Sequence, residues 1–256
     1  MTWEALMHPG QKLKPGARVV FEGDGVAIEG EVLERRFHGR RTIRLRADED
    51  VMRAIERIGH IPLPPYIKRA DTSEDRERYQ TVFAREAGSI AAPTAGLHFT
   101  PMLLETMRNG GVRLVYVTLH VGYGTFKPVR VDDIEEHRVD PETFSVAASA
   151  TGELVKAHAQ QRRIIAVGTT TTRVLESLQI QPEALSHLAG STDLFIRPGH
   201  QFRLVDGLVT NFHLPRSSLL MLVAAFAGRE HVMAAYREAV AQRYRFYSYG
   251  DAMLIV

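Results

Sequence analysis

The chain has 256 residues, of which 45% are hydrophobic and 24% charged, a composition typical of a globular protein with one large domain or two. The absence of cysteine excludes disulfides, thiolate metal sites and cysteine nucleophiles, and it fits a reducing cytoplasm. The net charge of +2 is too small to indicate nucleic-acid binding, so such a role requires a local basic patch.

No segment of the sequence indicates export or a membrane span. The N-terminal residues lack the pattern of a basic region followed by an apolar one that marks a signal peptide. The longest apolar run, Leu219 to Ala227, is much shorter than the roughly 18 residues that cross a bilayer and predicts a buried helix that ends at Gly228. We therefore expect a cytoplasmic protein without a membrane partner.

The first 58 residues predict a small β domain. Short β-prone runs cover Arg18 to Phe21, Val26 to Leu33 and Thr42 to Arg46, with turn residues between them. The pattern predicts an antiparallel, β-barrel-like domain over residues 1–58. Because its first strand begins almost at Met1 with no cap or linker ahead, we expect this domain to be incomplete at its N-terminus.

Six arginines lie between Arg35 and Arg46 in this domain. Such a cluster is suited to follow a phosphate backbone. The alternative is a solvated face whose arginines pair across the hairpin with Glu29, Glu31 and Glu34. Alternation assigns Ile43 and Leu45 to the opposite, apolar face. The residues alone leave both interpretations open.

The domain boundary is predicted near residue 59. Val51, Ile55 and Ile58 have helical spacing up to Gly59, and the next six residues contain three prolines, which form a stiff connector. We expect residues 59–256 to form one α/β domain with a mixed sheet. Its first charged run, Asp71 to Arg78, predicts a polar helix start or loop rather than a site.

The stretch from Gly88 to Thr100 combines small residues, a proline, a hydroxyl and an imidazole. Thr100 and Pro101 predict the N-cap and first residue of a helix that ends at Asn109. Thr94, Gly96 and His98 then lie where unpaired backbone N–H groups bind ligands, and Gly96 allows close approach. The alternative is a tight loop with a buried histidine.

Two further loops follow predicted strands. Val112 to Leu119 predicts a strand covered on both faces, which ends at His120 and is followed by Gly122 and Gly124. After a helix over about 148–161, a strand over 163–167 leads into Gly168-Thr-Thr-Thr-Thr-Arg173 at the start of another helix. This arrangement suits a carboxylate or phosphate, although surplus threonines at an N-cap explain it equally well.

Later in the chain, Asp206-Gly207 predicts a hairpin turn between residues 202–205 and 208–210. Beyond it stands the third of three histidines, His98, His120 and His213, that border ordered elements. Three such histidines favour acid/base chemistry over a structural role. Since no His-x-x-x-His or His-x-x-Glu-His spacing is present, we expect no metal.

Motifs along nearly the whole chain, in the right order, resemble one family, the S-adenosylmethionine:tRNA ribosyltransferase-isomerases of queuosine biosynthesis. They are Ala92-Pro-Thr-Ala-Gly-Leu-His-Phe99, Thr118-Leu-His-Val-Gly122, Gly168-Thr-Thr, Thr192-Asp-Leu-Phe-Ile196, Thr210-Asn-Phe-His-Leu-Pro215 and Tyr247-Ser-Tyr-Gly-Asp251. The resemblance implies that S-adenosylmethionine donates its ribosyl unit to 7-aminomethyl-7-deazaguanine at the tRNA wobble position. Adenine and methionine leave, and the sugar becomes the epoxycyclopentanediol of epoxyqueuosine.

This chemistry requires a base at the acidic C5′ protons beside the sulfonium and an acid at the adenine ring nitrogens. We expect His98 and His120 to supply this acid/base pair, with His213 or Asp251 positioning the ribose or the incoming amine. The expected substrate-binding residues are Thr94, Gly96, Gly122, Gly124, Gly168, Thr169, Thr170, Arg173, Asp193 and Asn211. Among them, Gly168 to Thr170 with Arg173 would hold the methionine carboxylate, and Asp193 and Asn211 would bind the ribose or base.

With tRNA as the implied partner, the arginine-rich hairpin becomes a stronger candidate for backbone contact, through Arg36, Arg40, Arg41, Arg44 and Arg46. We expect a monomer. The chain departs from the family in two respects. It lacks a further N-terminal segment, and it has His137-Arg-Val-Asp140 where the family often has His-Lys-Met-His, which leaves a substrate role for that second histidine without support.

The missing segment motivates an alternative, a truncated relative that binds tRNA or S-adenosylmethionine without turnover. Two other classes fit poorly. An ordinary methyltransferase would show a glycine-rich loop and a distal acidic residue, and a hydrolase would show Gly-x-Ser-x-Gly, and the sequence contains neither pattern.

Overall fold

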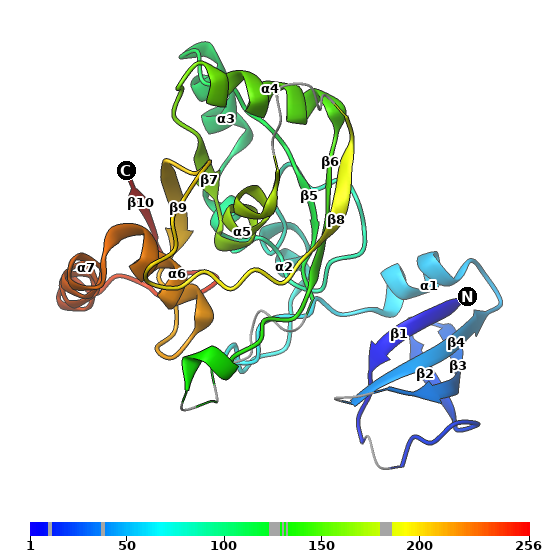
Figure 1. The fold of residues 1–256 in the computed structure, drawn as a ribbon. Helices are drawn as coiled ribbons and strands as arrows, with labels where there is room; N and C mark the ends of the chain where they lie inside the picture. Colours follow the sequence, from blue (N-terminus) through cyan, green and yellow to red (C-terminus); the bar gives the residue numbers. More distant parts are fainter. Residues whose placement is uncertain (10–11, 37–38, 123–128, 130, 132, 180–185) are drawn as a thin grey trace. The chain divides into compact units, whose positions relative to one another are not determined.

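The computed structural model describes residues 1–9, 12–36, 39–122, 129, 131, 133–179 and 186–256 (Figure 1). The chain separates into two compact units, Met1–Ile61 and Pro62–Val256. We describe each unit by itself.

The smaller unit is a four-stranded antiparallel sheet with one helix. Its strands are β1 (Thr2–Leu6), β2 (Arg18–Gly23), β3 (Val26–Arg35) and β4 (Arg40–Ala47), in the order β1-β4-β3-β2. Helix α1 (Val51–Ile58) has Asp50 as its N-cap, and Gly59 is its C-cap, where the sequence predicts the helix to end. In the described part of this unit no ladder joins the edge strands β1 and β2, so the antiparallel sheet is confirmed but the expected barrel closure is not found.

Strand alternation builds the core of this unit. Along β4, Ile43 and Leu45 are buried while Thr42 and Arg44 are half-buried and Arg46 is exposed, which confirms the predicted faces. The buried side chains pack with Ile28, Val32 and Ala54 from β3 and α1. The sheet therefore buries one face and presents most of its charged residues on the other, with Arg41 as an exception on the buried face.

The larger unit contains two three-stranded sheets. Strands β5 (Thr118–His120), β6 (Glu142–Val146) and β8 (Leu188–Thr192) are antiparallel, in the order β5-β6-β8. Strands β7 (Ile165–Val167), β9 (Gly207–Asn211) and β10 (Ala252–Ile255) form a mixed sheet in which β9 is parallel to β7 and antiparallel to β10. The α/β class with a mixed sheet is thus confirmed.

The helices of the larger unit agree with most predicted ranges. They are α2 (Ser73–Arg78), α3 (Pro101–Asn109), α4 (Ala148–Ala159), α5 (Thr169–Ser177), α6 (Ser218–Ala227) and α7 (Arg229–Ala241), with short 3-10 turns η2 (Thr94–His98) and η4 (Ile134–Glu136). The hydroxyl of Thr100 accepts the Leu103 N–H at 3.1 Å, so Thr100 is the N-cap of α3, as predicted. Among the described residues no single helix is long and apolar enough to cross a membrane, although α6 and α7, bent by 114°, pass that test as a pair.

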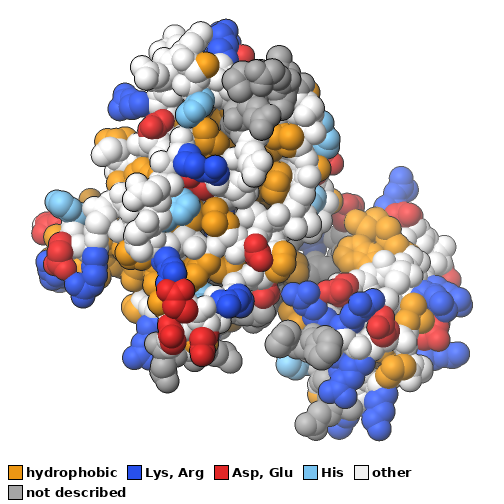
Figure 2. All heavy atoms as spheres, viewed as in Figure 1, with side chains coloured by type: hydrophobic (Ala, Val, Ile, Leu, Met, Phe, Trp, Pro, Cys, Tyr) orange, Lys and Arg blue, Asp and Glu red, His pale blue; other side chains and the backbone are white. Residues whose placement is uncertain are grey.

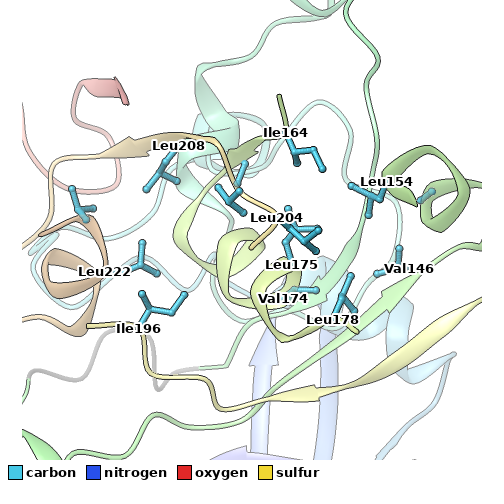
Figure 3. Close-up of a cluster of buried hydrophobic side chains, with 14 of the residues drawn as sticks. Val146, Leu154, Ile164, Val174, Leu175, Leu178, Ile196, Leu204, Leu208 and Leu222 are labelled. Carbon is cyan, nitrogen blue, oxygen red and sulfur yellow. The ribbon is translucent and has the colours of Figure 1, made fainter. Parts of the chain in front are cut away.

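Helix α5 lies at the centre of the main core. Val174 and Leu175 of α5 and the next residue after it, Leu178, point into a cluster that includes Leu208 of β9 and Leu154 of α4 (Figure 3). Residues from β6, β7 and α6 complete this cluster. Since α5 begins directly after β7, its burial fixes the loop at Gly168 against the mixed sheet.

Two predicted elements are wrong. The apolar run Val112 to Leu119 forms a strand only over Thr118–His120, at the edge of an antiparallel sheet, because β6 pairs with those three residues alone. Asp206 and Gly207 do not form a hairpin. Their N–H groups donate to Ile164 O, and the Asp206 carboxylate accepts the Ile164 N–H at 2.8 Å, so they begin the parallel pairing of β9 with β7.

Candidate functional site

One edge of the mixed sheet gathers residues from four distant motifs. Ala252 of β10 is opposite Asn211 of β9, and Val167 of β7 is opposite Val209. Gly168, Asn211 and Asp251 therefore lie at the same edge, where β7 and β9 have their carboxyl ends. Turn η2 packs against β9 and brings His98 to this edge.

The contact between His98 and Asn211 is the centre of this arrangement. Asn211 Nδ2 lies 3.1 Å from His98 Nε2, and it donates to Tyr247 O at 3.1 Å and to Gly250 O at 3.5 Å. Asn211 is only 2% exposed, and in the described part of the chain its Oδ1 has no hydrogen-bond partner. Asn211 thus uses its amide nitrogen to join η2 to the segment 247–250.

Partial desolvation and nearby charged groups shift the pKa of His98. Asp251 accepts the Arg245 N–H at 2.7 Å and an Arg245 guanidinium N–H at 3.1 Å, and these bonds lower the pKa of its carboxyl. Partial desolvation lowers the pKa of the exposed His98 imidazole, while the Asp251 charge opposes this shift and Arg245 adds to it. The net effect lowers the pKa of His98 and favours its neutral form.

A network that sequence reasoning missed holds the 247–251 segment. Tyr66 Oη is bonded to Ser248 Oγ and accepts the Ser248 N–H at 2.9 Å. Asp75, 3% exposed, accepts two bonds from Arg69 at 2.6 and 2.9 Å and one from Tyr249 Oη at 2.8 Å. Several hydrogen bonds hold the pKa of the Asp75 carboxyl well below its usual range, and those from Arg69 have the largest effect. The charged run, predicted to be a polar helix start or a loop rather than a site, forms helix α2, and nothing local indicates that its aspartate holds the 247–251 segment.

The loop after β7 differs from its predicted chemistry. Gly168 has φ of +93°, which favours glycine, and its N–H donates to Val209 O at 2.8 Å. Thr169 is buried, Thr170 is half-buried, and a hydrogen bond from Thr170 to Glu142 stabilises the charged form of that carboxyl. Thr172 likewise donates its hydroxyl to Gly168 O at 3.1 Å, so two of the loop's four threonine hydroxyls are already bonded within the protein.

Arg173 is not positioned to hold a free carboxylate. Its Nη1 donates to Glu142 at 2.9 Å, its Nε to Leu194 O at 2.9 Å, and its Nη2 to Thr192 O at 3.4 Å. The two paired side chains are 6% and 4% exposed. Burial raises the pKa of Glu142, although Arg173 opposes this shift. The predicted methionine-binding role of Arg173 conflicts with this geometry, because the guanidinium already serves as an internal tie.

The glycines have separate roles. Gly96 is buried, and a Cβ there would lie 2.8 Å from Thr81 Cγ2 and 2.9 Å from Phe83 Cζ, so core packing rather than ligand approach requires this glycine. Among the described residues, a Cβ at Gly122 would meet nothing within 4 Å. Thr94 is half-buried at the start of η2. The predicted Gly124 lies outside the described residues.

His120 lies in the antiparallel sheet rather than the mixed one. With Glu86, Ser145 and His187 it lines a cavity of about 430 Å³. Ser145 Oγ is 2.7 Å from His187 Nε2. His120 Nδ1 is buried, has no hydrogen-bond partner in the described chain and is covered by Gly88, where a Cβ would lie 2.8 Å away.

His213 does not join the sheet-edge group. Its Nε2 is 2.7 Å from Thr210 Oγ1, and its backbone N–H donates to Tyr236 Oη at 2.7 Å. Thr210 and Asn211 are successive residues of β9 and point to opposite faces. Burial lowers the pKa of His213 to about 4. This histidine is neutral and bonded within the protein, and its expected role in positioning the ribose or the incoming amine stays a prediction.

Asp193 is exposed and lines a separate hollow of about 240 Å³ with His137, Arg138 and Arg197. Arg197 pairs there with Glu135. The expected contact of Asp193 with the ribose or base finds no support at the sheet edge. Within the described ranges no group of three or more His, Cys, Asp or Glu side chains is arranged to hold a metal ion.

The arginines of the smaller unit alternate with acids. Ion pairs join Arg44 to Glu31 at 3.1 Å, Arg36 to Glu34 at 2.8 Å and Arg40 to Glu4 at 3.0 Å. Figure 2 shows basic and acidic side chains interspersed over this unit. Arg41 is 1% exposed and donates to Leu13 O and Arg40 O. The predicted tRNA contact by Arg41 is thus contradicted, because it belongs to the core face.

Comparisons with known proteins agree with the motifs. A family model described as "Queuosine biosynthesis protein" matches residues 1–255, which assigns the chain to the proteins of queuosine biosynthesis. The S-adenosylmethionine:tRNA ribosyltransferase-isomerase of Heliobacterium modesticaldum is 52% identical over 99% of this chain and 74% of its own length. The protein of the same name from Aquifex aeolicus is 48% identical, over 99% of this chain and 73% of its own length.

Comparison with a solved structure agrees with these sequence matches. The crystal structure of an S-adenosylmethionine tRNA ribosyltransferase from Thermotoga maritima matches with a TM-score of 0.53 at 40% identity, covering 100% of this chain and 70% of that one. The chain belongs to the family of S-adenosylmethionine:tRNA ribosyltransferase-isomerases. The resemblance inferred from six motifs is confirmed.

Proposed function

We propose that this chain transfers and isomerises the ribosyl moiety of S-adenosylmethionine onto 7-aminomethyl-7-deazaguanine at the tRNA wobble position. The product is epoxyqueuosine-tRNA, and adenine and methionine are released. One observation supports this reaction beyond family membership. A neutral histidine, a buried amide and an anchored carboxylate meet at one sheet edge, and they come from motifs shared with the family.

Each of these groups has a proposed role in the reaction. His98, with its lowered pKa, and His120, at its cavity, are the proposed partners for the two proton-dependent steps, loss of a C5′ proton and departure of adenine. Asp251 stays ionised because Arg245 bonds to it, so it suits a positively charged group such as a sulfonium or the incoming aminomethyl group. Gly168, with its fixed backbone, borders the ligand.

The test measures release of adenine and methionine from S-adenosylmethionine, with and without tRNA that carries 7-aminomethyl-7-deazaguanine. Release that depends on this tRNA supports the transferase. The variant His98→Ala should lose most turnover, whereas His231→Ala, which changes an exposed histidine of α7, should retain it. A cooperatively melting wild-type chain that releases neither product would instead favour the alternative, a relative that binds tRNA or S-adenosylmethionine without turnover.

We further propose that tRNA contacts the exposed arginine-bearing face of the smaller unit, through Arg36, Arg40, Arg44 and Arg46. The pairing with glutamates weakens this proposal but leaves the guanidinium groups half-exposed. Removing one arginine that binds a phosphate should reduce the slope of log K against log salt by roughly 0.7 to 0.9. Arg44→Glu with Arg46→Glu should therefore flatten the slope, and Arg53→Glu on α1 is the matched control. Equal slopes would favour the solvated face.

Three expectations remain predictions. We expect the enzyme to act as a monomer, without a metal and in the cytoplasm, where tRNA is modified. Sedimentation of the free chain and turnover after treatment with a chelator test the first two.

A further inference from the structure

The environment of Asn211 determines which of its side-chain atoms faces His98. Tyr247 O and Gly250 O lie 3.1 and 3.5 Å from Asn211 Nδ2. Both are acceptors, so the atom between them must be a donor. Exchanging the amide oxygen and nitrogen would place an oxygen against two carbonyl oxygens. The NH₂ group therefore points at these carbonyls and, at 3.1 Å, at His98 Nε2.

A donor at this position determines which ring nitrogen of His98 carries the proton. An N–H of Asn211 requires a lone pair on His98 Nε2, and a neutral imidazole with a lone pair on Nε2 carries its proton on Nδ1. Building on the proposed function, we propose that Asn211 is a positioning residue that holds His98 in the Nδ1–H tautomer, so that His98 meets the substrate as a hydrogen-bond donor through Nδ1.

This assignment separates the two proton-dependent steps. The lone pair of His98 is occupied by Asn211, so His98 is unsuited to take the C5′ proton, and its Nδ1–H stabilises an acceptor atom such as a purine nitrogen of the departing adenine. The charged groups that affect His98, Asp251 and Arg245, act on it electrostatically, and both are already bonded to each other. The low pKa of His98 agrees with an imidazole that remains neutral.

The tautomer is measured directly on the folded chain. A long-range ¹H–¹⁵N correlation spectrum of protein labelled with ¹⁵N-histidine distinguishes a protonated nitrogen from one with a lone pair, and the His98 signals are those absent in His98→Gln. We expect Nδ1 protonated and Nε2 unprotonated near neutral pH. Asn211→Ala should abolish this preference, whereas the matched control Arg245→Ala should keep it. A wild-type His98 protonated at Nε2 would overturn the proposal, whatever the variants do.

Turnover supplies a second test. The amide of asparagine reaches the position of the histidine Nδ1, and that of glutamine reaches the position of Nε2. His98→Asn should therefore retain about tenfold more kcat/KM than His98→Gln, the size of one hydrogen bond. The reverse order would contradict donation through Nδ1. A chain with the expected tautomer but no turnover in any form would refute the proposed function and leave the tautomer intact.

Discussion

Replacing Glu142 by leucine should destabilise the larger unit strongly, because it leaves the Arg173 guanidinium buried without its partner. The paired side chains are 6% and 4% exposed and their atoms lie 2.9 Å apart. Removing one partner of such a pair costs about 3–5 kcal/mol. At roughly 2–4 °C per kcal/mol for a unit of this size, the melting temperature should fall by about 6–20 °C.

The double variant Glu142→Leu with Arg173→Met removes the unpaired charge. It still leaves Leu194 O and Thr192 O without the bonds that Arg173 donates, so we expect a residual cost of about 1–3 kcal/mol. Denaturant or thermal unfolding of the two single variants and the double variant measures the coupling. Effects that simply add would refute the pair as a structural unit.

The same double variant tests whether Arg173 binds the methionine carboxylate. If Arg173 is an internal tie, the folded double variant should keep the wild-type KM for S-adenosylmethionine. A KM raised tenfold or more, with kcat preserved, would restore the carboxylate-binding role and refute our interpretation of the loop.

Gly96→Ala should cost about 1–3 kcal/mol because its Cβ would approach Thr81 Cγ2 to 2.8 Å. Adding Thr81→Ser should recover part of that loss. The control Gly122→Ala, whose Cβ would meet nothing within 4 Å among the described residues, should melt like the wild type. Equal losses at both glycines would contradict the packing argument. The pKa of His213 falls to about 4 on folding, so the wild type should lose up to about 3 kcal/mol of stability as pH falls from about 6.5 to 4, and His213→Gln should lose less over that range. The folded pKa of Asp75 is depressed, so the stability that it adds over Asp75→Asn should be present above about pH 3.9 and shrink as pH falls further, and a difference that does not change with pH would count against the network.

Local sequence signals were enough for the elements that local chemistry controls. Thr100 before Pro101 was predicted to be an N-cap, and its hydroxyl accepts the Leu103 N–H at 3.1 Å. Alternation along β4 correctly assigned Ile43 and Leu45 to the core. These features depend on side chains a few residues apart, so the chain carries them without reference to its fold.

Sequence-based prediction fails where contacts with residues far along the chain determine the local structure. No strand was predicted over the weak sequence Leu-Ala-Gly-Ser-Thr of β8, which pairs along its length with β6, where Phe144 lies opposite Gly190 and covers it. Arg41 is a different case, because alternation with Ile43 and Leu45 already places it on the core face, where Leu13 O and Arg40 O accept its hydrogen bonds.

The candidate site also contains both residues that the sequence identifies and residues that only the structure reveals. The motifs identified His98, Asn211 and Asp251, and the strand register brings them to one edge. Nothing in the sequence near Asp75 or Tyr66 indicates that these residues hold Tyr249 and Ser248. Their role is visible only through contacts that no local pattern encodes.

Those contacts also determine when the site forms during folding. The bonds from Ser248 and Tyr249 to Tyr66 and Asp75 join residues 182 and 174 positions apart, and Asn211 reaches His98 across 113. Closing loops of that length costs entropy before any contact repays it, so such pairings form late. We therefore expect the imidazole, the amide and the carboxylate to come together late in folding.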